Sequence, residues 1–318
     1  MTLTEDDRSI REAAALGTVA ERRQIAVTGQ DRAAYLQGLL TNDIVALTPG
    51  TGCYAAWLTP QGRMLTDLHV LQSDHMILLD VPAIAEVSTL ARLDQFIFSE
   101  DVQVASLSEH LVTAWVHGPQ GAAVLGRVLS GAQDVASWRL YQHAQLMFGD
   151  TAVSVVRIDQ AGVPGFCLFV ERSHAAGLIT GLEAAGARAV RAEAIEAARV
   201  EAGYPVFGVD MTEDIIPLEA GIEERAISFT KGCYVGQEIV IRVLHRGQGR
   251  VAKKLVPLTF SGALQPAGAK LHAGEREVGY VTSAAVSPRL GPIGLGYVHR
   301  DFVAPGTSLN EALVRSPS

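Results

Sequence analysis

Residues 111–190 carry the pattern that most restricts how this chain can fold. Short apolar runs that suit strands alternate there with two runs that suit helices. The expected order is strand, helix, two strands, helix and strand, over 111–116, 120–129, 151–158, 166–170, 173–185 and 187–190. This β-α-β-β-α-β order is the split arrangement of ferredoxin-like domains. We therefore expect a ferredoxin-like domain over residues 109–190.

The sequences on either side of this domain have different patterns of apolar runs and turns. Residues 1–108 begin with a short acidic helix and continue as strands and turns around one helix, which predicts an α/β domain. Residues 191–250 hold helices and short motifs, and part of them, 191–245, is expected to complete the first domain. From 251 to 318, short apolar runs alternate with glycine and proline turns, which predicts a small antiparallel barrel or sandwich. The expected class is α+β, in three domains.

The composition indicates a packed core and little disorder. Of the 318 residues, 48% are apolar and 19% are charged. The net charge of -8 argues against a general nucleic-acid coat, which needs a basic face. The start is acidic and no run of 18 apolar residues occurs, so we expect a cytoplasmic protein without membrane contact. Three separated cysteines argue against a disulfide framework, and the spacing of cysteine and histidine against a built-in metal site.

Asp67 interrupts the apolar strand that is predicted over 64–71. A carboxylate between Leu65 and Leu68 costs several kcal/mol of desolvation unless it has a partner. The alternative is an aspartate at a strand edge that faces water. The residue type alone leaves both interpretations open.

Glu201 occupies an unfavourable position for an acid. It lies in the last turn of a helix expected over 192–202, where the helix dipole disfavours negative charge by about 0.3–1 kcal/mol. Gly203 is expected to end this helix in the left-handed conformation. One interpretation is a solvated glutamate paired with a neighbouring cation. The other is a carboxylate presented to a ligand with paired N–H donors.

A thiol precedes a predicted helix in the segment KGCYVGQE. Its residues are Lys231, Gly232, Cys233, Tyr234, Val235, Gly236, Gln237 and Glu238. The N-terminus of the helix expected over 237–245 and the charge of Lys231 would both stabilise the thiolate of Cys233, which predicts a reactive cysteine. The alternative is a buried structural cysteine. Cys53 and Cys167 lie in apolar strand patterns, and we expect them to be inert.

Cations gather between residues 231 and 254. Six of them stand against the single acid Glu238, namely Lys231, Arg242, Arg246, Arg250, Lys253 and Lys254. Such an excess can bind an anionic ligand tail or an RNA backbone, or it can be an ordinary solvated face.

Taken together, these segments resemble the folate-binding family that contains the glycine-cleavage T-protein (aminomethyltransferase) and the YgfZ-type proteins. The resemblance runs from about residue 27 to residue 307. The stretches DRAAYLQGLLTND and GCYAAWLTPQGRMLTDL are similar to the T-protein pattern of Thr-Asn-Asp, Gly-x-x-Tyr and a strand-ending acid. Tyr54 and Asp67 match the pterin-contacting tyrosine and the catalytic aspartate of the family. Where T-proteins usually carry Asp-Asp, this chain has Thr66 before Asp67.

The segment KGCYVGQE resembles the YgfZ signature and differs from the T-protein equivalent, which lacks Cys233. The resemblance implies a protein that binds tetrahydrofolate and assists the synthesis or repair of iron–sulfur enzymes, such as the one that methylthiolates tRNA. It implies folate and iron–sulfur client or assembly proteins as partners. It also implies a three-domain cloverleaf around a central folate channel. We expect a monomer without stable nucleic-acid binding.

The resemblance also implies roles for single residues. Glu201 would accept the paired N–H donors of the pterin, and Tyr54 would stack on or flank the ring. Asn42, from the Thr-Asn-Asp pattern, would belong to the same binding site. Asp67 would hold a proton near the folate nitrogens that take up a one-carbon unit.

Three functions stay open. The leading one is a folate-dependent accessory protein of iron–sulfur metabolism, with Arg242 or Arg246 near the anionic glutamyl tail. The second is an aminomethyltransferase, or a related demethylase, that passes one-carbon units to tetrahydrofolate. Asp67 favours this second function, whereas Cys233 argues against it, because methylene transfer needs no thiol. The third is an RNA-binding module built on residues 231–254, which the acidity of the chain disfavours.

Overall fold

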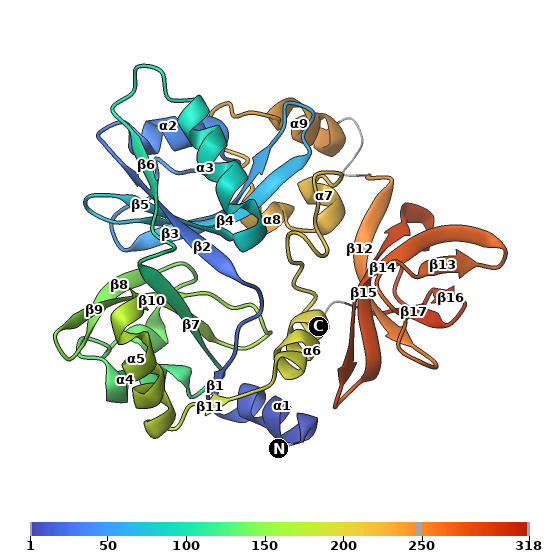
Figure 1. The fold of residues 1–318 in the computed structure, drawn as a ribbon. Helices are drawn as coiled ribbons and strands as arrows, with labels where there is room; N and C mark the ends of the chain where they lie inside the picture. The colour runs from blue at the N-terminus through green and yellow to red at the C-terminus, as the bar shows by residue number, and fades with distance from the viewer. Residues whose placement is uncertain (1, 246–249, 317–318) are drawn as a thin grey trace.

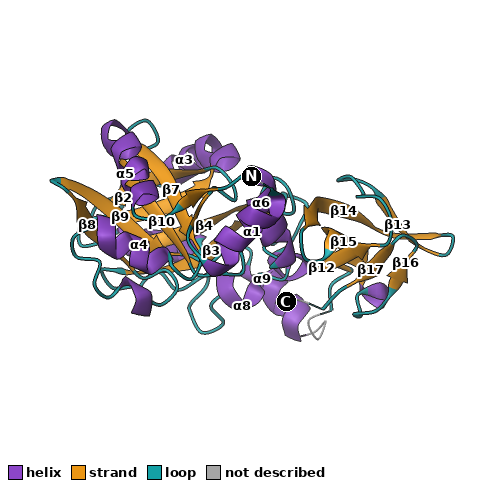
Figure 2. Cartoon of the chain, turned by 90° about the horizontal axis from the view of Figure 1, so that it is seen from below, coloured by secondary structure: helices purple, strands orange, loops and turns teal. Residues whose placement is uncertain are grey.

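The computed structural model describes residues 2–245 and 250–316, and it arranges them as three sheets joined by helices (Figure 1). Two sheets form the lobes at the left of Figure 1, and the third forms the barrel at the right. Figure 2 shows α1 and α6 between the lobes and the barrel. The connecting helices are α1 Leu3–Glu12, α6 Ala192–Glu201, α7 Pro217–Ala220, α8 Glu223–Ala226 and α9 Gln237–His245. No helix in these ranges has the length and apolar character needed to cross a membrane.

The first sheet carries apolar and polar side chains on opposite faces. Its antiparallel order is β3-β4-β5-β2-β6, with β2 Arg22–Thr28, β3 Thr51–Leu58, β4 Met64–Gln72, β5 Ile77–Pro82 and β6 Gln103–Ser106. Helices α2 Arg32–Leu39 and α3 Glu86–Gln95 cover the apolar face, where their leucines pack with Leu68 and Val70. Because alternate residues of a strand point to opposite faces, Asp67 and His69 lie on the other face.

The second sheet contains the expected β-α-β-β-α-β core and two further strands. Its order is β11-β1-β7-β10-β9-β8. The strands are β1 Ala15–Leu16, β7 Leu111–His117, β8 His143–Phe148, β9 Thr151–Arg157, β10 Gly165–Glu171 and β11 Arg188–Ala189, with helices α4 Gly121–Val128 and α5 Arg172–Ala184. The sequence pattern does not predict β8, because this edge strand is mostly half-exposed and lacks a clean alternation. Strand β1 belongs to residues expected in the first domain, and its two residues are too few for a periodic signal.

The first two sheets pack against each other, and their interface is half apolar and half polar. The apolar part contains Leu71, Leu78, Trp115, Val156, Cys167 and Phe169. In the polar part, Gln24 of β2 donates to Thr113 of β7 at 3.1 Å. The polar face of the first sheet is therefore buried against the second sheet, and this burial creates the candidate site.

The third sheet closes almost into a barrel, as expected. Its antiparallel order is β13-β14-β15-β12-β17-β16, with β12 Lys253–Phe260, β13 Lys270–Ala273, β14 Arg276–Ser287, β15 Gly291–His299, β16 Ser308–Leu309 and β17 Ala312–Val314. The two edge strands, β13 and β16, lie next to each other. Gly294 permits the close approach of β14 and β15, because a Cβ there would lie 2.7 Å from the carbonyl oxygen of Ser283.

Helix α6 fixes the barrel to the rest of the chain through a buried arginine. Arg199 Nη1 donates to Asp210 Oδ2 at 2.7 Å, and Arg199 Nη2 donates to the Ser283 hydroxyl at 2.7 Å. A buried ion pair of this kind holds its partners in one geometry, because separating them would leave a charge unpaired. The domain boundaries expected after residues 108, 190 and 250 stay a prediction.

Candidate functional site

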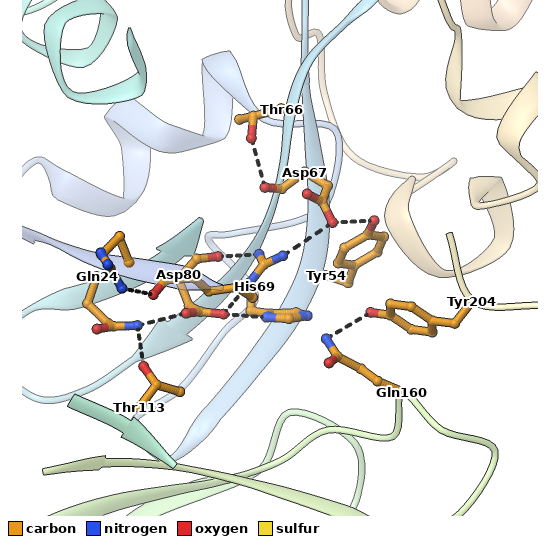
Figure 3. A network of polar contacts seen from close by, with 11 residues as sticks. Gln24, Tyr54, Thr66, Asp67, His69, Asp80, Thr113, Gln160 and Tyr204 are labelled. Carbon is orange, nitrogen blue, oxygen red and sulfur yellow. Dashed lines mark hydrogen bonds and ion pairs between the residues drawn. The ribbon is translucent and has the colours of Figure 1, made fainter. Parts of the chain in front are cut away.

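Asp67 is buried in the face of the first sheet that packs against the second (Figure 3). Only 2% of its surface is exposed. The Tyr54 hydroxyl on β3 donates to Asp67 Oδ2 at 2.8 Å, and Arg22 Nη1 lies 3.6 Å from the same oxygen. Asp67 Oδ1 has no hydrogen-bond partner among the described residues. The water-facing alternative for Asp67 is excluded, and the structure brings Tyr54 and Asp67 together.

A second buried aspartate, Asp80 of β5, holds Arg22 in place (Figure 3). Arg22 Nε donates to Asp80 Oδ2, and Arg22 Nη2 donates to the Asp80 carbonyl oxygen, both at 2.6 Å. His69 Nδ1 lies 2.8 Å from Asp80 Oδ2, and Gln24 Nε2 donates to Asp80 Oδ1 at 2.9 Å. Arg22 is therefore fixed with its third nitrogen facing Asp67.

Burial and the nearby Arg22 determine the protonation states of His69 and Asp80. Burial, assisted by the positive charge of Arg22, lowers the pKa of His69, so its imidazole is neutral at neutral pH. Burial alone would raise the pKa of Asp80, but Arg22 and His69 outweigh it and hold this pKa below its usual value. Because an ionised carboxylate only accepts hydrogen bonds, His69 must donate its Nδ1 proton to Asp80.

A cavity of about 290 Å³ opens beside Asp67. Its polar lining residues are Glu21, Arg22, Asp67, Gln160 and Tyr204, and residues 205–209 supply much of its apolar wall. Gln160 Nε2 and the Tyr204 hydroxyl lie 3.5 Å apart (Figure 3). The cavity thus combines an apolar surface with a few convergent polar groups, which is typical of small-molecule sites.

A second cation, Arg225 of α8, stacks on a wall of this cavity. Its guanidinium lies 4.3 Å from the centre of the Tyr204 ring and 4.9 Å from that of the Tyr54 ring. Asn42 Nδ2 donates to the carbonyl oxygens of Tyr54 at 2.8 Å and Arg225 at 3.2 Å. Asn42 therefore positions the residues of the site through their backbone and does not itself line the cavity.

The cavity fits the ring of a reduced folate. Small-molecule pockets commonly measure roughly 300–1,000 Å³, so a cavity of about 290 Å³ is of a size that suits a bicyclic ring. A buried acceptor without a partner is rare in folded proteins, and Oδ1 of Asp67, a residue that lines this cavity, is one among the described residues. A ring N–H would satisfy that oxygen, while Gln160 and Tyr204 offer further donors and acceptors.

Glu201 is already held by two arginines, which corrects the expectation of a carboxylate open to a ligand. Arg11 Nη2 lies 2.8 Å from Glu201 Oε2, Arg289 pairs with the same oxygen, and the Ser287 hydroxyl donates to Oε1. Glu201 is 2% exposed and does not line the Asp67 cavity. These contacts place the carboxylate beside α1 and the turn between β14 and β15, and Gly203 ends the helix just beyond it with φ +68°.

Lys231 anchors the KGCYVGQE segment to the end of α2. Its ammonium donates to the carbonyl oxygens of Gln37, Leu40 and Asn42 at 2.7, 2.7 and 2.8 Å. A cation at a helix C-terminus satisfies carbonyls that lack an intrahelical partner. The expectation that Lys231 serves the Cys233 thiolate is replaced by this structural role.

The other residues of the segment either anchor it or face outward. Tyr234 is buried. Gly236 has φ +84°, and a Cβ there would lie 2.6 Å from the Thr59 carbonyl oxygen, so only glycine fits. Cys233 and its neighbour Gly232 are exposed. The alternative of a buried structural cysteine therefore does not apply to Cys233.

The surroundings of the other two thiols agree with the expectation that they are inert. Burial raises the pKa of Cys53 to about 12, and it raises the pKa of the fully buried Cys167 well above its usual value. A thiol that stays protonated at neutral pH is a poor nucleophile. In the part of the chain that the structure describes, Cys233 is exposed, Cys53 is half-buried and Cys167 is buried.

Helix α9 begins at Gln237, as the sequence predicts, and carries the last residues of the segment. Glu238 and Arg242 are exposed on it, and neither lines the Asp67 cavity. Arg246, the alternative contact for a glutamyl tail, lies outside the described residues. The structure therefore does not bring the expected tail contact to the candidate site.

Sequence reasoning missed most of the residues around Asp67. These are Arg22, Gln24, His69, Asp80, Gln160, Tyr204 and Arg225. One signal was available, because Asp67 and His69 are two residues apart and so share a face of the strand. Asp80 likewise interrupts an apolar run. The contributions of Gln160, Tyr204 and Arg225 come from loops and short helices that carry no periodic signal.

The chain combines a buried carboxylate beside a cavity with a nearly closed barrel, and comparisons with known proteins show which family has this architecture. The family model described as the GCVT N-terminal domain matches residues 2–231. The model described as the glycine cleavage T-protein C-terminal barrel domain matches residues 253–313. The chain therefore belongs to the glycine-cleavage T-protein family. Tetrahydrofolate, expected from the motifs, is the cofactor of this family.

Similar proteins support this placement over nearly the whole chain. An aminomethyltransferase of Desulforamulus reducens is 30% identical over 322 residues, covering 98% of this chain and 86% of the relative. One of Streptomyces coelicolor is 29% identical, with 95% and 83% covered. The crystal structure of glycine cleavage system aminomethyltransferase T from Bartonella henselae matches with a TM-score of 0.86 and 25% identity, covering 99% of this chain and 88% of that one. These matches identify the family and leave the YgfZ subgroup unconfirmed.

Proposed function

We propose that this protein binds a reduced folate at the Asp67 cavity and transfers a one-carbon unit to it, as an aminomethyltransferase of the T-protein type. The observation that carries the proposal is Asp67, which lines a ring-sized cavity and whose Oδ1 is a buried acceptor without a partner among the described residues. Full-length similarity to proteins named aminomethyltransferase supports it. This reverses the order in which the sequence motifs ranked the two folate-dependent functions.

The two carboxylate oxygens of Asp67 have different roles in the proposed site. Tyr54 and Arg22 contact Oδ2 and fix the plane of the carboxylate. Oδ1 is left to accept a proton or an N–H from the ligand, which is general acid–base work. Tetrahydrofolate, when bound, supplies the ring nitrogens that carry the one-carbon unit. Gln160 and Tyr204 would orient its ring against Asp67.

The test is a calorimetric titration with tetrahydrofolate, combined with a transfer assay from the aminomethyl-lipoyl carrier protein. Asp67→Asn should lower transfer by about 10²–10⁴-fold, the usual contribution of a general acid–base group, while folate still binds. Asp74→Asn is the matched control, because this aspartate is exposed on the turn between β4 and β5. A wild-type protein that binds folate but transfers nothing would overturn the transferase proposal.

A second variant tests where the ring lies. Glu201→Gln should leave the affinity for tetrahydrofolate within about twofold of wild type, because Glu201 faces Arg11 and Arg289 and not the cavity. A ring held by Glu201 would instead lose a charged hydrogen bond, which is worth about 1.5–3 kcal/mol. Weakening of that size would move the pterin away from Asp67.

The exposed thiol of Cys233 favours a second candidate function, the folate-dependent accessory role in iron–sulfur metabolism. Methylene transfer needs no thiol, yet the segment around Cys233 is anchored on both sides and leaves this side chain open. In cells that lack the protein, Cys233→Ser should then fail to restore iron–sulfur enzyme activity. Glu238→Gln, an exposed change in the same segment, is the control. Full complementation by Cys233→Ser would remove this candidate.

A further inference from the structure

One wall of the Asp67 cavity is the loop that follows α6. Residues 204–209 of this loop all line the cavity. The backbone amides of Val209, Asp210 and Met211 donate to the Val206 carbonyl oxygen at 3.2, 2.7 and 3.1 Å. These bonds close the loop on itself and do not fix it relative to the sheet that carries Asp67. The position of this wall must therefore come from contacts outside the loop.

Asp210, at the end of the loop, accepts hydrogen bonds from three parts of the chain. Its Oδ2 accepts from Arg199 Nη1 of α6 at 2.7 Å and from the Val206 amide of the loop at 3.0 Å. Its Oδ1 accepts from the hydroxyls of Thr282 and Ser283 of β14 at 2.5 and 2.7 Å. A carboxylate offers about four lone-pair positions, and these bonds use all of them. The buried Asp210 thus holds α6, the loop and the barrel in one arrangement.

A break in the register of β14 explains how two consecutive side chains reach the same carboxylate. Neighbouring residues of a regular strand point to opposite faces of the sheet, so Thr282 and Ser283 would not share a partner. The register of β14 against β15 shifts between Val281 and Ser283, as it does at a β-bulge. Bulges re-aim side chains and are frequent next to functional sites. This one directs both hydroxyls of the barrel toward Asp210.

Arg199 extends these contacts to the first residue of the wall. Its Nη1 also donates to the Tyr204 carbonyl oxygen, and its Nη2 donates to the Ser283 hydroxyl, both at 2.7 Å. The Tyr204 hydroxyl lies 3.5 Å from Nε2 of Gln160, which lines the same cavity (Figure 3). Arg199 and Asp210 are each 1% exposed and do not line the cavity. The barrel is therefore connected to the cavity wall through groups that lie outside the cavity.

We propose that the barrel positions this wall of the Asp67 cavity, with Asp210 and Arg199 as positioning residues that the hydroxyls of Thr282 and Ser283 hold in place. The inference rests on the proposed folate binding and deepens it, because residues that touch no ligand then determine how tightly the ring is bound. Binding residues are effective only when their own positions are fixed by such supporting contacts.

The position of the wall should affect binding more than the chemical step. Asp67 is held by Tyr54 and Arg22, and neither of these contacts involves the loop or the barrel. A change in the barrel should therefore raise KM and leave kcat almost unchanged, which is the sign of lost binding and not of a lost catalytic group.

The test is the double variant Thr282→Val, Ser283→Ala, which removes both hydroxyls and changes no residue of the cavity. Its Kd for tetrahydrofolate, measured by isothermal calorimetry, should rise about tenfold, which corresponds to about 1.4 kcal/mol. In transfer from the aminomethyl-lipoyl carrier protein, KM for tetrahydrofolate should rise with it, while kcat stays within about threefold of wild type. Thr282→Ser retains a hydroxyl and should bind as tightly as wild type. If the double variant does not fold, Ser283→Ala alone should raise Kd about threefold.

Ser287→Ala is the matched control. Ser287 also lies on β14, and its buried hydroxyl also donates to a carboxylate of α6, that of Glu201, which does not line the cavity. This variant should lower the urea midpoint by a similar amount and keep Kd within about twofold of wild type. Equal weakening of folate binding by Ser287→Ala and by the double variant would reveal general destabilisation and overturn the inference.

Amide hydrogen exchange separates this inference from the proposed function, because it needs no ligand. The peptide that spans 204–211 should exchange about tenfold faster in the double variant and at the wild-type rate in Ser287→Ala. Unchanged exchange, or faster exchange without weaker tetrahydrofolate binding, would overturn the inference. Failure of wild type to bind tetrahydrofolate would reject the proposed function, and faster exchange of the loop would then still support its positioning by the barrel.

Discussion

The functional groups of the Asp67 site and of the Cys233 loop (residues 231–236) differ in burial. Asp67 lies between two sheets, and the charges around it are paired inside the protein. Cys233 is exposed, and the contacts that hold its loop come from the residues on either side of it. A buried carboxylate at a cavity suits a small ligand that can enter, whereas an exposed thiol suits a partner too large to do so.

The comparison also separates residues that hold the fold from residues that are free to act. In the Asp67 site the same side chains do both, because removing one charge leaves another buried without a partner. In the Cys233 loop the two tasks fall on different residues, since Lys231 and Gly236 anchor the loop and Cys233 does not. Substitutions in the two regions should therefore differ in their cost to stability.

Asp80→Asn should have the largest effect on stability. It leaves the Arg22 guanidinium buried without the carboxylate that contacts it at 2.6 Å. Breaking a buried pair in this way costs about 3–5 kcal/mol of unfolding free energy. Urea unfolding measures the loss, with Asp74→Asn as the exposed control. A cost below about 1 kcal/mol would mean that Asp67 alone can balance Arg22, and the contrast between the regions would weaken.

Lys231→Met should cost about 2–3 kcal/mol, because it leaves three backbone carbonyls near the end of α2 without their donor. Lys254→Met, at an exposed lysine, is the control and should change the unfolding free energy by less than about 0.5 kcal/mol. Equal effects of the two variants would show that Lys231 does not anchor the loop.

His69→Gln should change how stability depends on pH. Burial keeps His69 neutral in the folded protein, while the unfolded chain binds a proton on it below about pH 6.5, its ordinary value. The unfolding free energy of wild type should therefore fall as the pH drops from about 6.5 to 5. The variant should lose up to about 1.4 kcal/mol per pH unit of this slope. His75→Gln, at an exposed histidine, should retain the wild-type slope.

Cys233→Ser should have the smallest effect on the fold, below about 0.5 kcal/mol, because its side chain is exposed. Thiol labelling of the native protein should modify Cys233 first and leave Cys53 and Cys167 unmodified until the protein unfolds. Mass spectrometry of the labelled peptides identifies the site. Early labelling of Cys53, or marked destabilisation by Cys233→Ser, would contradict the division of tasks in the loop.

Much of the fold followed from sequence, because its elements have clear periods or clear boundaries. Helix α9 begins at the predicted Gln237, and Gly203 ends α6 as expected. The regular spacing of glycine and proline turns predicted a small antiparallel barrel or sandwich, and the structure has the barrel. Strand β8 and the two-residue β1 carried too little pattern to be found.

The candidate site was predicted only where a motif named it. Tyr54 and Asp67 meet as the resemblance implied, but Glu201 does not join them. No local pattern could show that Arg11 and Arg289, 190 and 88 residues away in the chain, would hold the carboxylate of Glu201. Lys231 is a similar case, because its three acceptors belong to a helix end almost two hundred residues earlier.

The placement of β1 has a consequence for producing the ferredoxin-like domain, expected over residues 109–190, on its own. Residues Ala15–Leu16 stand between β7 and β11, antiparallel to one and parallel to the other. The edge strand β11 thus joins this sheet only through β1, which lies almost a hundred residues before β7 in the chain. A fragment that starts at residue 109 should expose the edge of β7 and leave β11 without a neighbour, so we expect it to be poorly folded. The same fragment supplied with residues 2–17 as a peptide should regain its structure.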